Sequence, residues 1–480
     1  MRPLRCGLAL ALGAALLGAA LLGVAGTAAA HDARSLSRDA ALRLAAERNA
    51  SLLVQSLERD RLGAVADTAR SPYLPTLAVE TAARANGPRV DGTDPLVHRA
   101  IEAVGTLSYK SPYGQSVAVV GTVTAGVDNQ PSGRALALDV SQALLRGGFH
   151  GGATDLRQAD LDVKIARELY RSGLNQLLRQ TDRAYWDLAF AREDVDIKRR
   201  SRDRARAQYE ETRENIRRGL LAPGEIYLVE ENVVNFDDLL SRADENLAVA
   251  QSALRRLLNL PPGVAVEASS AVEASAVPAA PEAESLGVAV ARNPAVLAAR
   301  LAVERAAEGV GGSVRDALPQ LDVFGRLGVA SGATGGLLVY VPGDRQLRAG
   351  LRGSLPLYWG PDAARVRRAR AELAQRRGDL ADAESAATTA VHDAAVRIRA
   401  REQRLDLASR LVDLGQKKLD VERDKYKSGL STLADVVRFQ RDVDTALSGA
   451  IRARVDVLAA RTEMLAARGD LHDSLQVAVR

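Results

Sequence analysis

Cysteine and aromatic residues are scarce in this chain of 480 residues. One cysteine, Cys6, cannot form a disulfide within the chain, so a disulfide framework is excluded. Aromatic residues make up 4% of the chain although 47% of its residues are hydrophobic. The apolar content is therefore mostly Ala, Leu and Val, a composition that is readily accommodated in helices.

The chain also has little excess charge and no recognisable catalytic motif. Its 65 basic and 60 acidic residues give a net charge of +5, too small at this length to indicate a nucleic-acid partner. No histidine pair has the i, i+4 spacing of a helical zinc site, and the G-x-S-x-G, phosphate-loop and dinucleotide motifs are missing. We therefore expect no enzyme activity, no catalytic or metal-binding residues and no cofactor.

The first thirty residues have the order of a secretory signal. Arg2 and Arg5 precede an apolar run from Leu8 to Val24, and small residues ending at Ala30 follow it. We predict a signal peptide over residues 1–30 that is cleaved after Ala30 and removes Cys6; an uncleaved membrane anchor is the alternative. After Val24 no run of 18 apolar residues occurs, so no helical membrane span is expected.

The rest of the chain contains a duplication. The motif Leu-Pro-x-Leu at 74–77 recurs at 318–321, and Asn49 matches Asn293, both with an offset of 244 residues. Near the end of each copy Gly219-Leu220 matches Gly429-Leu430 with an offset of 210, so the first copy is 34 residues longer. We predict a first repeat at 31–263, a solvated linker rich in Ala, Pro, Glu and Ser at 264–284, and a second repeat at 285–480.

Each repeat changes from helix to strand and back to helix. Strands are predicted at about 75–143 in the first repeat, namely 76–85, 103–110, 116–127 and 134–143, and at about 320–357 in the second. Helical hairpins are predicted at about 154–258 and 362–467, with turns at Gly219 and Gly429. The first arm of each hairpin lacks proline and would extend for close to ~100 Å.

A seven-residue apolar repeat favours coiled-coil packing of these helices. It comprises Val391, Ile398, Leu405, Val412, Leu419 and Tyr426. A second stripe of Leu407, Leu411 and Leu414 indicates contact with a second neighbour. An ordinary two-helix coiled coil, as in an exported structural or adhesive protein, gives the same pattern and remains an alternative at this point.

The strand edges require closure, because unpaired edges invite aggregation. Membrane β-barrels need at least eight strands, more than one chain supplies. Three chains with four strands each would give twelve. Oligomerisation is thus the expected solution.

These motifs in this order resemble the TolC-like outer-membrane efflux protein family. The resemblance rests on the duplicated Asn49 and Asn293 helix starts, the two Leu-Pro-x-Leu strand entries, Gln142 to Gly148 where strand returns to helix, Ala184-Tyr185-Trp186-Asp187-Leu188, and the two Gly-Leu turns. It covers nearly the whole chain after the signal segment. A periplasmic adaptor, the third alternative, would show one hairpin instead of two copies.

The resemblance implies a mainly α fold with a β-barrel part. It implies a homotrimer with a twelve-stranded barrel in the outer-membrane lipid and a periplasmic α-helical barrel that tapers to an entrance. The expected partners are a periplasmic adaptor (membrane fusion protein) and an inner-membrane pump of the RND or ABC class. Such a protein is a passive conduit for small molecules, metals or polypeptides, in an efflux or type I secretion system.

The resemblance also places the entrance after the turn of the second copy. Asp435 falls on the first aspartate of the family's carboxylate ring, and Tyr426 falls on a tyrosine that holds the entrance shut. Arg438 occupies the place of the second aspartate and Ser431 that of a basic residue. We expect at most one Asp435 ring beside an Arg438 ring. An exposed aspartate favoured by the helix dipole is the alternative.

Positive charge gathers before the first hairpin turn. Residues 198–218 carry nine basic and four acidic residues, against six and four in residues 408–428. We predict that the helical tips dock the adaptor; a solvated helix face is the alternative. The predicted docking residues are Arg199, Arg200, Arg204, Gly219, Leu220, Gly429 and Leu430.

Overall fold

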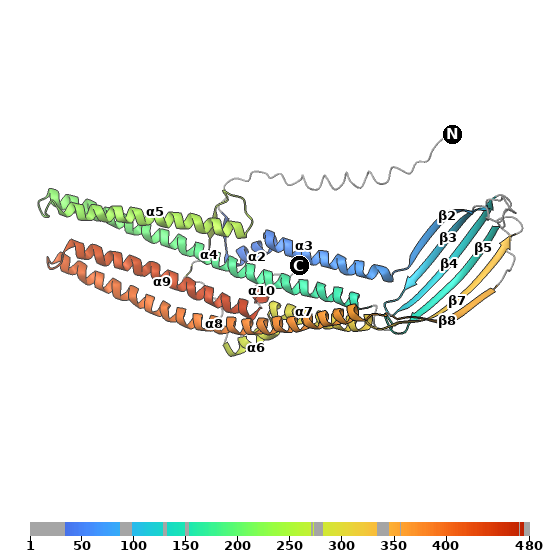
Figure 1. Ribbon diagram of the computed structural model, residues 1–480. Coiled ribbons are helices and arrows are strands. Elements are labelled where there is room, and N and C mark those ends of the chain that lie inside the picture. Colours follow the sequence, from blue (N-terminus) through green and yellow to red (C-terminus); the bar gives the residue numbers. More distant parts are fainter. Residues whose placement is uncertain are drawn as a thin grey trace, which may run out of the picture. The chain divides into compact units, whose positions relative to one another are not determined.

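The computed structural model describes residues 34–86, 98–127, 132–148, 153–269, 272, 282–333, 345–355, 357–469 and 471–474. The predicted signal segment and its cleavage site lie outside the described residues. The described part divides into two units, one that contains the sheet and one that contains the hairpin turns. Figure 1 shows the elements, of which the long helices run through both units.

The helices follow the predicted order in both copies. In the first copy they are α2 (Arg38–Arg48), α3 (Ala50–Arg70), α4 (Thr154–Arg217) and α5 (Glu225–Leu257). In the second they are α6 (Glu282–Arg292), α7 (Pro294–Asp316), α8 (Gly360–Lys427) and α9 (Leu433–Arg468), followed by the short α10 (Leu471–Ser474). Helices α4 and α8 have 64 and 68 residues.

The larger sheet contains six strands. A barrel of twelve strands built from three chains would require four strands per chain. The strands are β2 (Thr76–Asn86), β3 (His98–Lys110), β4 (Gln115–Val127), β5 (Ser132–Ala143), β7 (Gln320–Ala333) and β8 (Arg345–Ser354). They pair antiparallel in the order β2-β3-β4-β5-β7-β8. The expectation of four strands was wrong because β3 and β4 enter the same sheet.

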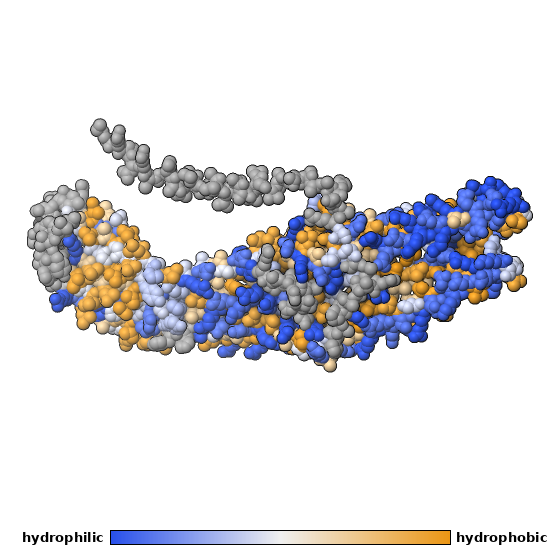
Figure 2. All heavy atoms as spheres, turned by 180° about the vertical axis from the view of Figure 1, so that it is seen from behind, coloured by the Kyte–Doolittle hydropathy of each residue, from blue (hydrophilic) through white to orange (hydrophobic). Residues whose placement is uncertain are grey.

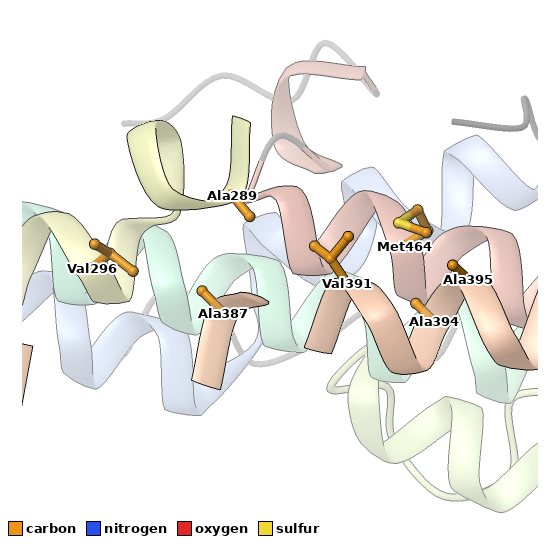
Figure 3. Packing of buried hydrophobic residues seen from close by; sticks show 7 residues of the cluster. All are labelled: Ala289, Val296, Ala387, Val391, Ala394, Ala395 and Met464. Atoms are coloured by element: carbon orange, nitrogen blue, oxygen red, sulfur yellow. The ribbon is translucent and has the colours of Figure 1, made fainter. Parts of the chain in front are cut away.

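The helices of the unit that contains the sheet share a small-residue core. Ala289 of α6, Val296 of α7, Val391 of α8 and Met464 of α9 are almost completely buried together (Figure 3). By length and composition Glu282–Asp316 would pass as a membrane span. Two helices form this stretch, however, and their buried residues pack against α8 and α9. The apolar composition thus serves helix packing.

Each duplicated asparagine ties a helix start to the end of its hairpin. The amide of Asn49 donates to the Leu257 carbonyl at 3.0 Å, and the amide of Asn293 donates to the Ala467 carbonyl at 3.0 Å. These carbonyls lie in the last turns of α5 and α9, where no intrahelical donor is available. The Asn293 side chain also caps α7 by accepting from the Ala295 amide. The conserved offset between copies therefore has a hydrogen-bonding reason.

The second unit has its own buried centre. Tyr185 and Trp186 of α4 are fully buried and meet edge to face at 5.3 Å between ring centroids. The Tyr185 hydroxyl donates to the carbonyl of Leu36 in β1 (Arg34–Leu36) at 3.1 Å. Strand β1 pairs in parallel with β6 (Val266–Ala268). The predicted linker is thus not wholly solvated, because Val266 and Val272 in it are fully buried.

A seam of polar contacts joins the two copies in this unit. Along α4 and α9 it pairs Arg183 with Asp456 at 3.2 Å and Asp187 with Arg452 at 2.8 Å. Closer to the turns, Arg204 pairs with Asp444 at 2.6 Å, and the Asp444 side chain is only 2% exposed. A buried carboxylate requires such a partner, because an unpaired buried charge is costly. Arg204 therefore holds the first hairpin against the second.

Replacement of Arg204 should weaken this seam. We expect Arg204→Met to lower the free energy of unfolding by about 1–3 kcal/mol, since Asp444 loses its cationic partner while the half-exposed arginine moderates the effect. Arg199→Met, at an exposed position of the same helix, is the matched control and should change little. Urea titration of the purified protein measures both. Equal unfolding midpoints would contradict this role of Arg204.

Candidate channel entrance at the hairpin turns

The two hairpin turns have the same backbone structure. Gly219 and Gly429 both have a φ of 73°, a left-handed conformation that favours glycine. The Gly219 amide donates to Ile216 and the Leu220 amide to Asn215, and in the second turn Gly429 and Leu430 donate to Tyr426 and Lys425. This pair of bonds is the Schellman motif, which satisfies the last carbonyls of a helix. Glycine is thus required at both positions.

The leucine that follows each glycine faces solvent. Leu220 is 69% exposed and Leu430 is 80% exposed. In a Schellman motif this position usually packs against the preceding turn of the helix. Within the described residues both side chains are instead available for a partner.

Asp435 has local partners at the start of α9. The Thr432 hydroxyl, just before the helix, donates to the Asp435 carboxylate at 2.6 Å, and the Asp435 amide lies 3.2 Å from the same hydroxyl. Arg438 pairs with the Asp435 carboxylate at 3.0 Å across one turn. The side chains of Asp435 and Arg438 are 35% and 64% exposed. The start of α9 is thus stabilised by the contacts of Asp435 with Thr432 and Arg438.

Tyr426 lies in a small apolar cluster that links the two hairpins. The cluster is centred on Val229 of α5 with Leu433 and Val437 of α9, and Tyr426 packs against it. Burial raises the pKa of the Tyr426 hydroxyl, and the carboxylates of Glu211 and Glu225 raise it further. The hydroxyl is accordingly neutral at ordinary pH. The ring belongs to the packing between α5, α8 and α9.

Ser431 donates a hydrogen bond to a carboxylate, Glu422, that no sequence pattern singled out. Its hydroxyl donates to Glu422 of α8 at 2.5 Å, and the Lys425 ammonium lies 3.3 Å from the same carboxylate group. The Ser431 hydrogen bond lowers the pKa of Glu422, Lys425 lowers it too, and burial and Asp435 act in the opposite sense. Glu422 and Ser431 face each other across the turn. A second carboxylate therefore stands near Asp435.

The three predicted docking arginines differ in their surroundings. Arg199 and Arg200 are exposed, while Arg204 is occupied by Asp444. Arg199 lies 18 residues before the end of α4, about 27 Å along the helix. These arginines thus lie along the side of the first hairpin, whereas Leu220 and Leu430 lie at the turns of the first and the second hairpin. Among the residues that the structure describes, no group of three or more His, Cys, Asp or Glu gathers as metal ligands would.

Comparison with known proteins agrees with this geometry. Residues 41–260 and 286–470 match the family Outer membrane efflux protein. Protein CyaE of Bordetella pertussis is 25% identical over 352 residues, which cover 70% of each chain.

Solved structures give the same fold. The Campylobacter jejuni CmeC outer membrane channel matches with a TM-score of 0.68 at 14% identity, over 90% of this chain and 85% of that one. The open state of the Neisseria gonorrhoeae MtrE outer membrane channel matches with a TM-score of 0.66 at 18% identity, over 90% and 88%.

The family match decides between the alternatives raised by the sequence. An adhesive coiled coil explains neither the two matched stretches nor the membrane-type sheet beside the helices. The sheet and the long helices together have the fold of these outer membrane channels. The chain belongs to the outer membrane efflux protein family.

Proposed function

We propose that three copies of the chain form a passive channel across the outer membrane, which exports solutes delivered by a periplasmic adaptor and an inner-membrane pump. The observation that carries this proposal is the sheet, whose two faces differ in polarity and whose edge strands β2 and β8 each have one neighbour among the described strands. In lipid every backbone group needs a partner, so such a sheet requires closure by further copies.

Exposed apolar residues on the helices support the same assembly. Leu407, Leu411 and Leu414 of α8 are 58–61% exposed in the single chain. The predicted second stripe is therefore free of partners within the described part of the chain. A neighbouring copy would cover it, as expected for helices with contacts on two sides.

Conduction tests the proposal directly. We expect the purified protein to run as a heat-modifiable trimer from the outer-membrane fraction and to produce single-channel steps in planar bilayers. Recovery as a soluble periplasmic monomer without conductance would refute a channel. In this proposal the energy for export comes from the pump. The channel itself does not convert the solute chemically.

The charges at the entrance should set ion selectivity. With Asp435 paired to Arg438 and Glu422 paired to Lys425, the ring that three copies form there is close to neutral. We expect Asp435→Asn to lower the cation-to-anion permeability ratio about twofold and Arg438→Gln to raise it about twofold, since each leaves its partner's charge uncompensated. Reversal potentials in a salt gradient measure both ratios.

Arg410→Gln is the control for this experiment, because Arg410 is an exposed residue of α8 far from the turn. If Asp435→Asn and Arg438→Gln both left the reversal potential at the wild-type value, these residues would not line the conduction path. The helix-capping role would then be the whole function of Asp435.

Adaptor docking is proposed to use the exposed leucines Leu220 and Leu430 and the exposed arginines Arg199 and Arg200. We expect the double substitution Arg199→Glu with Arg200→Glu to reduce adaptor crosslinking several-fold, because charge attraction steers association. Leu220→Asn with Leu430→Asn should reduce it as well, through loss of apolar contact at the turns. Quantitative crosslinking in cells that carry the pump measures the effect.

The double substitution Arg367→Glu with Arg368→Glu is the matched control. These two adjacent arginines are also exposed, but they lie near the start of α8, far from its hairpin turn. Docking along the hairpin requires that this control retain wild-type crosslinking. Equal loss in both double variants would indicate a general charge effect and would rule out a local docking surface.

A further inference from the structure

Among the described strands, the β3 and β4 hairpin has no counterpart in the second copy. In the second copy β7 pairs directly with β8, whereas in the first copy β3 and β4 stand between β2 and β5. The first copy is 34 residues longer between its landmarks, and the hairpin spans residues 98–127. An inserted hairpin therefore accounts for most of the difference between the copies.

The insertion is a full member of the sheet. Strand β3 aligns with β2 from Thr76 opposite Ser108 to Asn86 opposite His98, and β4 aligns with β5 from Gln115 opposite Gln142 to Thr124 opposite Gly133. Both inserted strands are thus hydrogen-bonded on both sides. A hairpin folded away from the sheet would have left β2 beside β5.

The inserted strands continue the two faces of the sheet. On one face, the apolar face, Leu77 of β2 lies opposite Leu107 of β3, which lies opposite Val119 of β4 and then Leu138 of β5. The row ends with Leu327 of β7 and Leu347 of β8. All six side chains are 37–79% exposed. Figure 2 shows this apolar surface over the strands.

The opposite face, the polar face, is hydrophilic across the same six strands. Thr76 and Ser108 share a hydrogen bond at 2.8 Å, and Ser116 and Ser141 share one at 2.6 Å. On β7, Arg326 pairs with Asp139 of β5 at 3.5 Å. Apolar and polar residues therefore alternate along the inserted strands as they do in a membrane barrel wall.

The turn between β3 and β4 packs closely against a neighbouring segment of the same chain. Gly114 in the turn has a φ of 80°, and its carbonyl accepts from the Ala143 amide at 2.9 Å. A Cβ on Gly114 would lie 2.4 Å from the Gly147 carbonyl oxygen. The turn thus packs closely on the segment that leads from β5 to α4. This fit indicates an established part of the fold.

The register gives a strand tilt that suits a closed barrel. Aligned partners lead from Thr76 through Ser108, Ala118 and Asp139 to Arg326 of β7. The duplication equates Thr76 with Gln320, so the row advances six residues, from 320 to 326, over four strand steps. With a rise of ~3.3 Å and a spacing of ~4.8 Å, the tilt is about 45°, at the upper end of the range for membrane barrels.

We propose that the β3 and β4 hairpin is an inserted barrel segment, so that three copies close an eighteen-stranded barrel in which β2 of one copy pairs with β8 of the next. The inference rests on the proposed trimer and deepens it. At this tilt and spacing, eighteen strands give a diameter of about 39 Å between strand axes, against about 26 Å for twelve. The outer-membrane section accordingly admits larger solutes, including polypeptide chains.

Disulfide mapping within one chain tests the insertion. The only cysteine, Cys6, lies in the predicted signal segment, so no native cysteine of the mature chain would compete with the introduced ones. We expect Ala78→Cys to link with Thr106→Cys, and Thr122→Cys to link with Ala135→Cys, since each pair is directly opposite in the register. Links of Ala78→Cys with Asp139→Cys or Ser141→Cys would place β2 beside β5 and overturn the insertion.

A second set of cysteines tests closure between copies. Ala82→Cys in β2 is combined with Arg348→Cys, Gly350→Cys or Arg352→Cys in β8, all on the polar face, and linked chains are separated on denaturing gels. At least one combination should yield covalent dimers and trimers. Monomers in every combination would overturn the trimer itself, whereas trimers without the links from β2 to β3 would overturn only the inserted hairpin.

Polymer exclusion from the external side tests the width. We expect larger poly(ethylene glycol) molecules to enter and reduce conductance in the full chain than in a variant that lacks residues 98–127. The same size cut-off in both proteins would overturn the wider barrel. If the deletion variant does not assemble, the cysteine links in the full-length chain still decide where the hairpin lies.

Discussion

Hydrogen bonding of the backbone at the sheet edges is the constraint on which this structure depends. A strand in hydrocarbon has no water to satisfy its amides and carbonyls, and each unsatisfied group costs several kcal/mol, about as much as a large buried contact contributes. Strands β2 and β8 end the sheet of one chain. Among the strands that the structure describes, none supplies the missing partners of these two edges, and the proposed assembly of copies follows from this constraint.

The helices follow from the same requirement. In the proposed trimer, copies that meet at β2 and β8 also bring their helices together, and those helices then need apolar faces on two sides. The exposed Leu407, Leu411 and Leu414 and the buried Val391 and Leu419 of α8 fit this demand. Small residues such as Ala387 and Ala394 permit close approach of neighbouring helices. The aromatic-poor composition is thus explained by thin helices packed side by side.

Most elements could be predicted from the sequence, because their signals are local or repeated. The offset of 244 residues identified both strand entries, and the positive φ of Gly219 and Gly429 agrees with turns at those residues. Strand count per sheet could not be predicted, since pairing of β3 with β2 depends on register and not on composition. The sequence predicted the individual strands. It did not predict that all six of them belong to one sheet.

Contacts between distant residues were also beyond the sequence. Arg204 was assigned to docking because it lies in a basic run, and the sequence did not show that Asp444, 240 residues away, pairs with it. The carboxylate of Glu422 escaped notice because its partner Ser431 lies across a turn. In both cases the charge pattern along one helix did not reveal the partner of the charged residue. Burial, which decides whether a surface charge is free, is a property of the packed helices.

The proposed width of the barrel shifts selectivity to the helical end of the channel. A wall of eighteen strands holds its polar side chains far apart, and pairs such as Arg326 with Asp139 neutralise part of their charge. Widely spaced, compensated charges produce a weak field in water, where charges more than about 10 Å apart are largely screened. Discrimination between solutes then belongs to the hairpin turns, where Asp435, Arg438 and Glu422 lie close together.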